Sequence, residues 1–176
     1  FEFRDVIAPL AHKGFRVAAV DLRGFGMSDK PPAGGGQDIR TLTGDISGII
    51  QALGYDKAIV AGNDTGASLA WSVAIDKPER VSGVVSISGA FPVDLRRSIA
   101  ARPWDFLYLL ASSFWCRLPV HTVPQKFYKA ELDNNTSSKF RKNDALKYEE
   151  FLRLRHQASQ IGNVQRGAVN NHRLLT

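Results

Sequence analysis

The chain has 176 residues, of which 44% are apolar and 23% are charged, the composition of one globular domain. No apolar run approaches the ~20 residues that a transmembrane helix needs, and there is no signal-peptide pattern, so we expect a cytoplasmic protein with no membrane partner. The single cysteine, Cys116, excludes an intramolecular disulfide. Met27 is the only methionine and the chain opens directly in a predicted helix, so we expect a piece of a longer protein.

The charge is distributed unevenly along the chain. Residues 1–90 carry a net charge of −1, whereas residues 91–176 carry +7. A basic half can indicate nucleic-acid binding. In this half, however, the basic residues alternate with acidic and apolar residues at helical spacing, which is typical of solvated helix faces. We therefore expect no nucleic-acid partner.

The first ninety residues are predicted to alternate helices with strands. Apolar spacing predicts helices over residues 3–10, 42–53 and 66–75, the last stopped by Pro78. Short apolar runs predict buried strands over 16–21, 57–61 and 81–88, and the segment 22–38, rich in Gly and Pro, is predicted to be a loop. Such alternation favours a parallel sheet with helices on both faces.

After residue 91 the β-branched runs stop and the pattern becomes helical. Helices are predicted over 104–114 and 144–157, with a turn or loop over 132–138. We therefore predict a partial α/β core over residues 1–91 and a helical cap, or lid, over residues 92–176. Most of the aromatic side chains in this second part are expected to fill the core of the lid itself.

The candidate for chemistry is Asp64, in the sequence Gly62-Asn63-Asp64-Thr65-Gly66. The spacing Gly-x-Asp-x-Gly matches a nucleophile elbow with Asp in place of the common Ser, and its strained centre requires neighbours with almost no side chain. Asp64 would stand at a helix N-terminus, where the helix dipole favours an anion, and a carboxylate can attack an electrophilic carbon to form an ester. The alternative is that Asp64 only caps the helix.

Two motifs carry a resemblance to a known family. The loop 21–29, with Gly24-x-Gly26-x-Ser28, resembles the segment after the fourth strand of α/β hydrolases, and of epoxide hydrolases in particular. Residues 62–67 are similar to the elbow of that family, and residues 167–173 resemble the end of its helical cap. The resemblance implies an α/β-hydrolase fold, a mostly parallel sheet flanked by helices with a helical cap, in a fragment lacking the family's first and last core strands. The loop lacks the third glycine of a dinucleotide fingerprint, which makes a dinucleotide site a poor interpretation. We expect no cofactor and no metal.

The resemblance also implies a reaction. Asp64 would open an epoxide to give a covalent ester, which a His-activated water would hydrolyse, the His not being in this chain. The backbone N–H of Thr65 would be an oxyanion donor. Cap residues would protonate the epoxide oxygen, and the candidates are Tyr108, Tyr128, Tyr148 and His172, each of which also fits simple packing in the lid. Asp94 is a candidate for an acid placed early in the chain.

Two alternatives stay open. The first is a haloalkane dehalogenase or another hydrolase with an Asp nucleophile, although Thr65 stands where dehalogenases carry a halide-binding Trp. The second is a non-catalytic α/β-hydrolase-like domain that binds a ligand under its lid. A small apolar substrate is the expected partner, and a homo-oligomer remains an open alternative.

Overall fold

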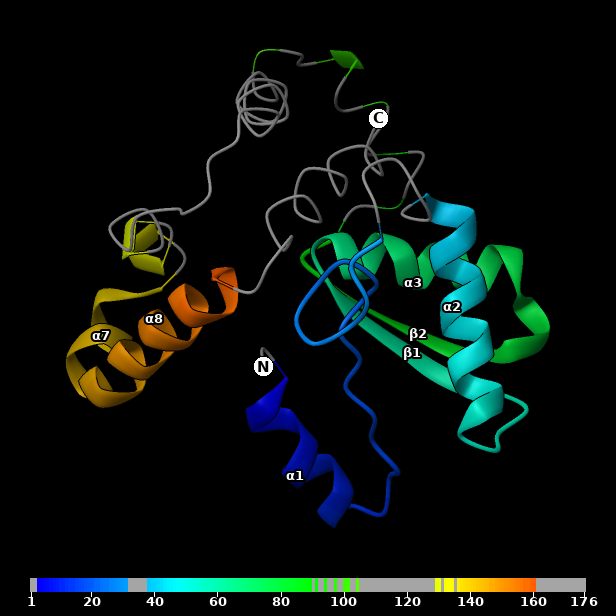
Figure 1. The fold of residues 1–176 in the computed structure, drawn as a ribbon, viewed down its shortest axis with the longest axis horizontal. Coiled ribbons are helices and arrows are strands. Elements are labelled where there is room, and N and C mark those ends of the chain that lie inside the picture. Colours follow the sequence, from blue (N-terminus) through cyan, green and yellow to red (C-terminus); the bar gives the residue numbers. More distant parts are fainter. Residues whose placement is uncertain are drawn as a thin grey trace.

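The computed structural model describes residues 3–31, 38–89, 91, 94, 97, 100–101, 104, 129–130, 132–134 and 136–160. In chain order its elements are helix α1 (Arg4–His12), helix α2 (Ile39–Ala52), strand β1 (Ala58–Asn63), helix α3 (Thr65–Asp76), a 3₁₀ turn (Pro78–Arg80), strand β2 (Val81–Ile87), helix α7 (Ser138–Asn143) and helix α8 (Ala145–Ser159). Figure 1 shows how they are arranged.

Strands β1 and β2 pair in parallel, and helix α3 forms the connection between them. The register runs from Ala58 opposite Val81 to Asn63 opposite Ile87. Both strands come from β-branched runs, which favour extended, half-buried backbone. The predicted strands, helix and parallel pairing are therefore confirmed at this point of the chain, and the carboxyl ends of both strands lie at the same edge.

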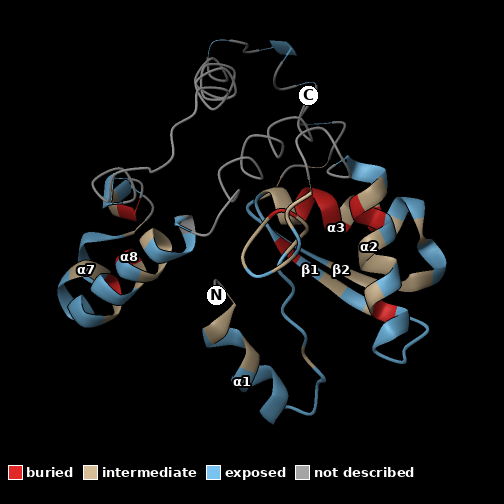
Figure 2. Ribbon diagram, viewed as in Figure 1, coloured by how far each residue is buried: buried red, intermediate tan, exposed pale blue. Residues whose placement is uncertain are grey.

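One face of the sheet is covered by α3, and α2 packs against α3 (Figure 2). The centre of this layer is a buried cluster of Leu42, Leu69 and Val73, joined by Leu22 and by apolar side chains from α2 and both strands. The N-cap of helix α2 is Asp38, whose carboxylate accepts the Thr41 amide at 2.9 Å, an ordinary N-cap contact.

The other side chains of the strands have a different environment. Ile59, Val85 and Ile87 are 56%, 46% and 48% exposed, although strand residues of this type are usually buried. Side chains alternate between the two faces of a strand, so exposure of apolar residues along β1 and β2 indicates a face that the described residues leave largely uncovered.

The predicted strand over 16–21 is wrong. The structure assigns no strand there, and Phe15 and Val20 are 55% and 41% exposed. The apolar run has the side-chain pattern of a strand, but a strand also needs a neighbouring backbone with which to exchange hydrogen bonds. Within the described residues the sheet consists of β1 and β2 alone, so this segment has no strand to pair with.

The C-terminal helices form a second, smaller core. Leu132, Tyr148 and Leu152 are buried together, and the rings of Phe140 and Phe151 pack edge to face with centroids 6.3 Å apart. Helix α8 confirms the helix predicted over 144–157. The boundary between core and cap at residues 91 and 92 stays a prediction.

The loop predicted over 132–138 is wrong in part, because residues 132–134 are helical. The buried Leu132 explains the difference, since it anchors the polar run to the second core and its carbonyl accepts the Thr136 hydroxyl at 2.6 Å. The helix predicted over 104–114 lies outside the described residues except for Trp104, which is exposed.

Helices α1 and α8 contact each other through two ion pairs of opposite polarity. The Arg4 guanidinium lies 3.2 Å from the Glu150 carboxylate, and the Lys147 ammonium lies 2.8 Å from the carboxylate of Asp5. Arg4 also stacks over the ring of Phe151 at 4.4 Å.

Among the helices that the structure describes, none is both long and apolar enough to cross a membrane.

Candidate functional site

Asp64 occupies a sharp bend between β1 and α3. Its backbone angles are φ 52° and ψ −118°, which lie outside even the small left-handed region that some non-glycine residues adopt. The Asp64 amide donates to the Ile87 carbonyl at 3.0 Å, while its own carbonyl accepts the Ala67 amide at 3.0 Å. The bend is thus held from both sides, by the sheet and by the helix, and these bonds maintain a backbone conformation that is unfavourable by itself.

The side chain of Asp64 is exposed and makes no capping hydrogen bond to the first turn of α3. A helix-capping Asp is recognised by such a bond to the second or third amide of the helix. The geometry therefore differs from the capping alternative, and the carboxylate projects from the carboxyl end of β1 without being tied to the helix.

The two glycines of the elbow differ in the space around them. A Cβ at Gly62 would lie 2.0 Å from the Gly66 carbonyl oxygen and 2.6 Å from the Ala67 nitrogen, so only glycine fits without a shift of backbone. At Gly66, by contrast, nothing lies within 4 Å of an added Cβ. Steric crowding therefore requires glycine at position 62, whereas the space around position 66 does not.

The start of helix α3 supplies the electrostatic setting. Thr65 is the first helical residue, and an α-helix provides no internal acceptor for the amide at that position. The small residues Ala67 and Ala70 are fully buried, which lets the helix lie close behind the bend. Asp64, the residue directly before the first turn, therefore lies at the positive, N-terminal end of the helix dipole.

The Gly24-x-Gly26-x-Ser28 loop is held together by Asp21. The Ser28 hydroxyl donates to the Asp21 carbonyl at 2.6 Å, and the Asp21 carboxylate accepts the Met27 amide at 3.0 Å. Gly24 and Gly26 both have positive φ, and a Cβ at Gly26 would lie 2.1 Å from the Asp21 carboxylate. The structure thus gives this motif a role in shaping the loop.

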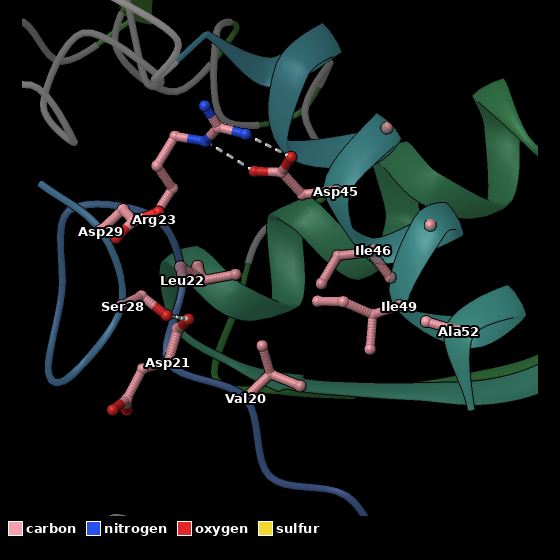
Figure 3. A pocket seen from close by; sticks show the side chains of 12 residues that line it. Val20, Asp21, Leu22, Arg23, Ser28, Asp29, Asp45, Ile46, Ile49 and Ala52 are labelled. Carbon is pink, nitrogen blue, oxygen red and sulfur yellow. Dashed lines mark hydrogen bonds and ion pairs between the residues drawn. The ribbon is translucent and has the colours of Figure 1, made fainter. Parts of the chain in front are cut away.

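An open cavity of about 430 Å³ lies between this loop and helix α2 (Figure 3). Ile46 and Ile49 point into it from α2 toward Val20, and Arg23 and Asp45 form a two-bond ion pair at one side, with distances of 2.6 and 2.8 Å. That pairing raises the pKa of Arg23. The full lining is Val20, Asp21, Leu22, Arg23, Ser28, Asp29, Gly44, Asp45, Ile46, Gly48, Ile49 and Ala52. Asp64 is not among these residues, so the cavity and the elbow are separate features.

The candidate proton donors fall into two groups. Tyr108, Tyr128 and His172 lie outside the described residues. Tyr148 is buried, and its hydroxyl donates to Asp133 at 2.7 Å and accepts a longer bond from Lys129 at 3.4 Å. Burial, followed by the bond to Asp133, raises the pKa of Tyr148. In this structure the hydroxyl is occupied by partners within the helical segment.

Asp94, the candidate early acid, lies seven residues beyond the end of β2. It is exposed, and its carboxylate lies 3.9 Å from the guanidinium of Arg97, one helical turn further along.

Within the part of the chain that the structure describes, no three His, Cys, Asp or Glu side chains are grouped so as to hold a metal ion.

Two features were not predicted from the sequence. Ser88 has φ 52° and is, with Asp64, one of the two non-glycine residues of positive φ in the described segments. A serine carries little signal for such backbone, although the following Gly89 marks a turn. The ionic network around Asp133 was also not predicted: Lys129 is only four residues away, but Arg141 and Tyr148 come from helices further along the chain and reach Asp133 through packing.

Comparison with known proteins relates this chain to one family. A family model described as the α/β hydrolase fold matches residues 2–117. Epoxide hydrolase B of Mycobacterium tuberculosis is 41% identical over 91 residues, which are 52% of this chain and 26% of that protein. Epoxide hydrolase 2 of Siraitia grosvenorii is 34% identical over 116 residues, which are 65% of this chain and 36% of that protein.

Among solved structures, an α/β hydrolase from Nostoc sp. PCC 7120 is similar, with a TM-score of 0.66 and 23% identity. The similarity covers 96% of this chain and 59% of the Nostoc chain. At this identity it supports the fold alone. Together with the family match it confirms the predicted fold class, a parallel sheet flanked by helices that corresponds to part of the family's fold.

Proposed function

Since this chain belongs to the α/β-hydrolase fold family, we propose that it is the nucleophile-bearing part of an epoxide hydrolase, with Asp64 as the nucleophile. The observation that carries the proposal is the Asp64 carboxylate, presented from a strained bend with no capping bond to the helix behind it. The matched epoxide hydrolases from two distant organisms support the same reaction class.

In the proposed first step, a carboxylate oxygen of Asp64 attacks a ring carbon of the epoxide. The ring C–O bond breaks, an ester forms between Asp64 and the substrate, and the released alkoxide takes a proton from a donor in the cap. In the second step a water molecule, activated by a histidine, adds to the ester carbonyl, which returns Asp64 as a carboxylate and releases the diol. We assign that base to none of the four histidines of this chain.

The Thr65 amide is proposed as an oxyanion donor in the second step. When water attacks the ester, negative charge develops on the carboxyl oxygen of Asp64, which is next to the N-terminus of α3. A backbone N–H at the first helical position has no competing acceptor within the helix and is fixed in advance, so it stabilises this charge with little reorganisation. The side chain of Thr65 has no part in this role.

The proposed substrate is a small apolar epoxide. A dehalogenase would share the Asp nucleophile and the ester, but it requires donors for the departing halide, and the Thr65 side chain provides no indole N–H. A purely ligand-binding domain would fit better with an Asp64 side chain that caps α3, and no such bond is formed.

The test is a single-turnover experiment in the complete protein. Asp64→Asn is expected to abolish diol formation and the mass increase of the peptide that contains residue 64, because an amide is a very weak nucleophile. The matched control is Asp56→Asn, at an exposed position two residues before β1, which should leave both signals unchanged. Diol formed by Asp64→Asn at the wild-type rate would contradict the covalent mechanism, and halide release by the wild-type protein from a haloalkane, with no diol formed from an epoxide, would favour a dehalogenase.

A further inference from the structure

The carboxyl ends of β1 and β2 carry two matching bends. Asn63 lies opposite Ile87 in the register, so Asp64 and Ser88 are the next residues of their strands, and both have φ 52°. A positive φ is uncommon for any non-glycine residue and marks a place where surrounding structure holds the backbone. Within the described residues, this pair accounts for all such cases, and the two residues are adjacent at one edge of the sheet.

Directly after Ser88, the chain passes close over the first turn of α3. A Cβ placed at Gly89 would lie 2.7 Å from the carbonyl oxygen of Asp64 and 2.2 Å from the Cβ of Ala67. Gly89 does not have the positive φ seen at several other described glycines, so glycine is needed there because of this close approach and not for its backbone freedom. The Ser86 hydroxyl closes the turn with a long hydrogen bond to the Gly89 carbonyl, at 3.5 Å.

We propose that the turn formed by Ser88 and Gly89 is a positioning element for the Asp64 carboxylate, bracing the elbow from the neighbouring strand. The inference rests on the proposed function of Asp64. The end of β2 and the turn constrain the elbow at two points: the Ile87 carbonyl accepts the Asp64 amide at 3.0 Å, and Gly89 passes so close to the Asp64 carbonyl that a Cβ there would clash with it. The Asp64 amide is therefore held by the end of β2, while its carbonyl is bonded to α3 and confined by Gly89.

This brace has a direct consequence for the chemistry. The direction of the Asp64 side chain follows from its φ and ψ, and these angles relax if the carbonyl can rotate. A misplacement of about 1 Å in a reacting group can cost on the order of 100-fold in rate, because attack requires a near-ideal approach. The turn thus contributes to the rate of ester formation and has no reason to contribute to substrate affinity.

The first test compares two glycine-to-alanine variants on β2 and its turn, in the complete protein. Gly89→Ala is expected to slow ester formation in single turnovers by at least about tenfold, because it displaces the Asp64 carbonyl, while leaving the substrate Kd, taken from the concentration dependence of the single-turnover rate, within about twofold. Gly83→Ala is the matched control, since a Cβ at Gly83 meets only the Ile59 side chain, at 3.7 Å, an ordinary contact. Equal rates of ester formation in the two variants would overturn the proposal.

A second variant separates positioning from general loss of stability. Ala67→Gly combined with Gly89→Ala removes the contact between the two Cβ atoms and keeps the contact with the Asp64 carbonyl. Gly89→Ala should therefore lower Tm much less in the Ala67→Gly background than in the wild-type background. Ester formation should stay slow in the double variant. Recovery of the rate in parallel with Tm would show a merely structural role and overturn the proposal.

If Gly89→Ala does not fold, Ser88→Gly provides the test. This change permits many backbone conformations at residue 88 and so loosens the brace without adding atoms. Ester formation is expected to slow several-fold with folding retained, and a wild-type rate would overturn the proposal. Asp64→Asn, measured in the same assay, separates the proposed function of Asp64 from the proposed role of the turn. Activity in Asp64→Asn would contradict the proposed function. An inactive Asp64→Asn together with fully active turn variants would contradict only the positioning role of the turn.

Discussion

The Asp64 amide donates a hydrogen bond to the Ile87 carbonyl at 3.0 Å, so the pairing between the two parallel strands continues one residue past the end of β1. At that residue the backbone turns through φ 52° into helix α3. The sheet thereby holds the backbone of the proposed nucleophile in this conformation. The free energy that the conformation costs can be measured by substitution at residue 64.

The first prediction concerns that cost. Asp64→Gly should raise the free energy of unfolding by about 1 kcal/mol, because glycine adopts positive φ without the strain of about 1–3 kcal/mol and loses only part of this gain to the entropy of the unfolded chain. Diol formation should be lost at the same time. Thermal unfolding and the activity assay check both outcomes.

Asp56→Gly is the control for this prediction. Asp56 has no positive φ, so glycine there should lower the free energy of unfolding by up to about 1 kcal/mol, the ordinary effect of a more flexible chain. A similar decrease in Asp64→Gly would mean that residue 64 is not strained.

The second prediction separates the two glycines of the elbow. Gly62→Ala should destabilise the fold by about 3 kcal/mol or more, because the new Cβ meets the backbone of Gly66 and Ala67 within 2.6 Å. Gly66→Ala should be neutral or stabilising by up to about 1 kcal/mol, since it has open space and alanine is the better helix former. Denaturant unfolding of both variants gives the comparison, and equal losses would contradict the structure of the bend.

The third prediction concerns pH and the network around Asp133. The bond from Tyr148, followed by that from Lys129, lowers the pKa of Asp133 below its ordinary value of 3.8. A lowered carboxyl pKa gives stability that is present above the unfolded pKa and lost as pH falls through the folded one. Tyr148→Phe should therefore lower Tm by about 2–4 °C at pH 7, and this difference should shrink as pH falls below about 4.

Activity provides the control for Tyr148. Because its hydroxyl is bound to Asp133 and Lys129, Tyr148→Phe should keep a wild-type kcat at a temperature where both proteins are folded. A large loss of kcat with an unchanged Tm would instead assign Tyr148 to proton donation in the reaction.

The fourth prediction tests the contact between α1 and α8. Glu150→Lys places a positive charge against Arg4, 3.2 Å away in the native pair, and should lower Tm by a few degrees at low salt. The loss should decrease in 1 M salt, where the screening length falls to about 3 Å. Glu149→Lys makes the same change of charge at the adjacent position, for which the described residues contain no ion pair, and should have a smaller effect.

The order of elements over residues 39–87 could be predicted from sequence because each local signal agrees with its tertiary setting. The β-branched run before Gly62 forms a strand, and the small residues after it form a closely packed helix. The run at 16–21 has the same local signal, yet it forms no strand, since pairing depends on a neighbour that the run itself cannot specify.

The backbone geometry around Asp64 could be predicted in part, whereas its role in a reaction stays a prediction. Spacing located Asp64 and the need for glycine at 62, because both follow from the geometry of one turn. The bend at Ser88 depends on how closely two consecutive elements pass each other, and the partners of Tyr148 come from residues up to 19 positions away. Such relationships arise from packing, which a single sequence read along its length does not display.

The half-exposed Ile59, Val85 and Ile87 have a practical consequence for anyone who purifies this polypeptide. Exposed apolar side chains on a two-stranded sheet associate between molecules in concentrated solution, because association releases water from the apolar surfaces. Handling losses, turbidity and non-specific adsorption to vessel walls should therefore increase with protein concentration, and mild detergent should suppress all three.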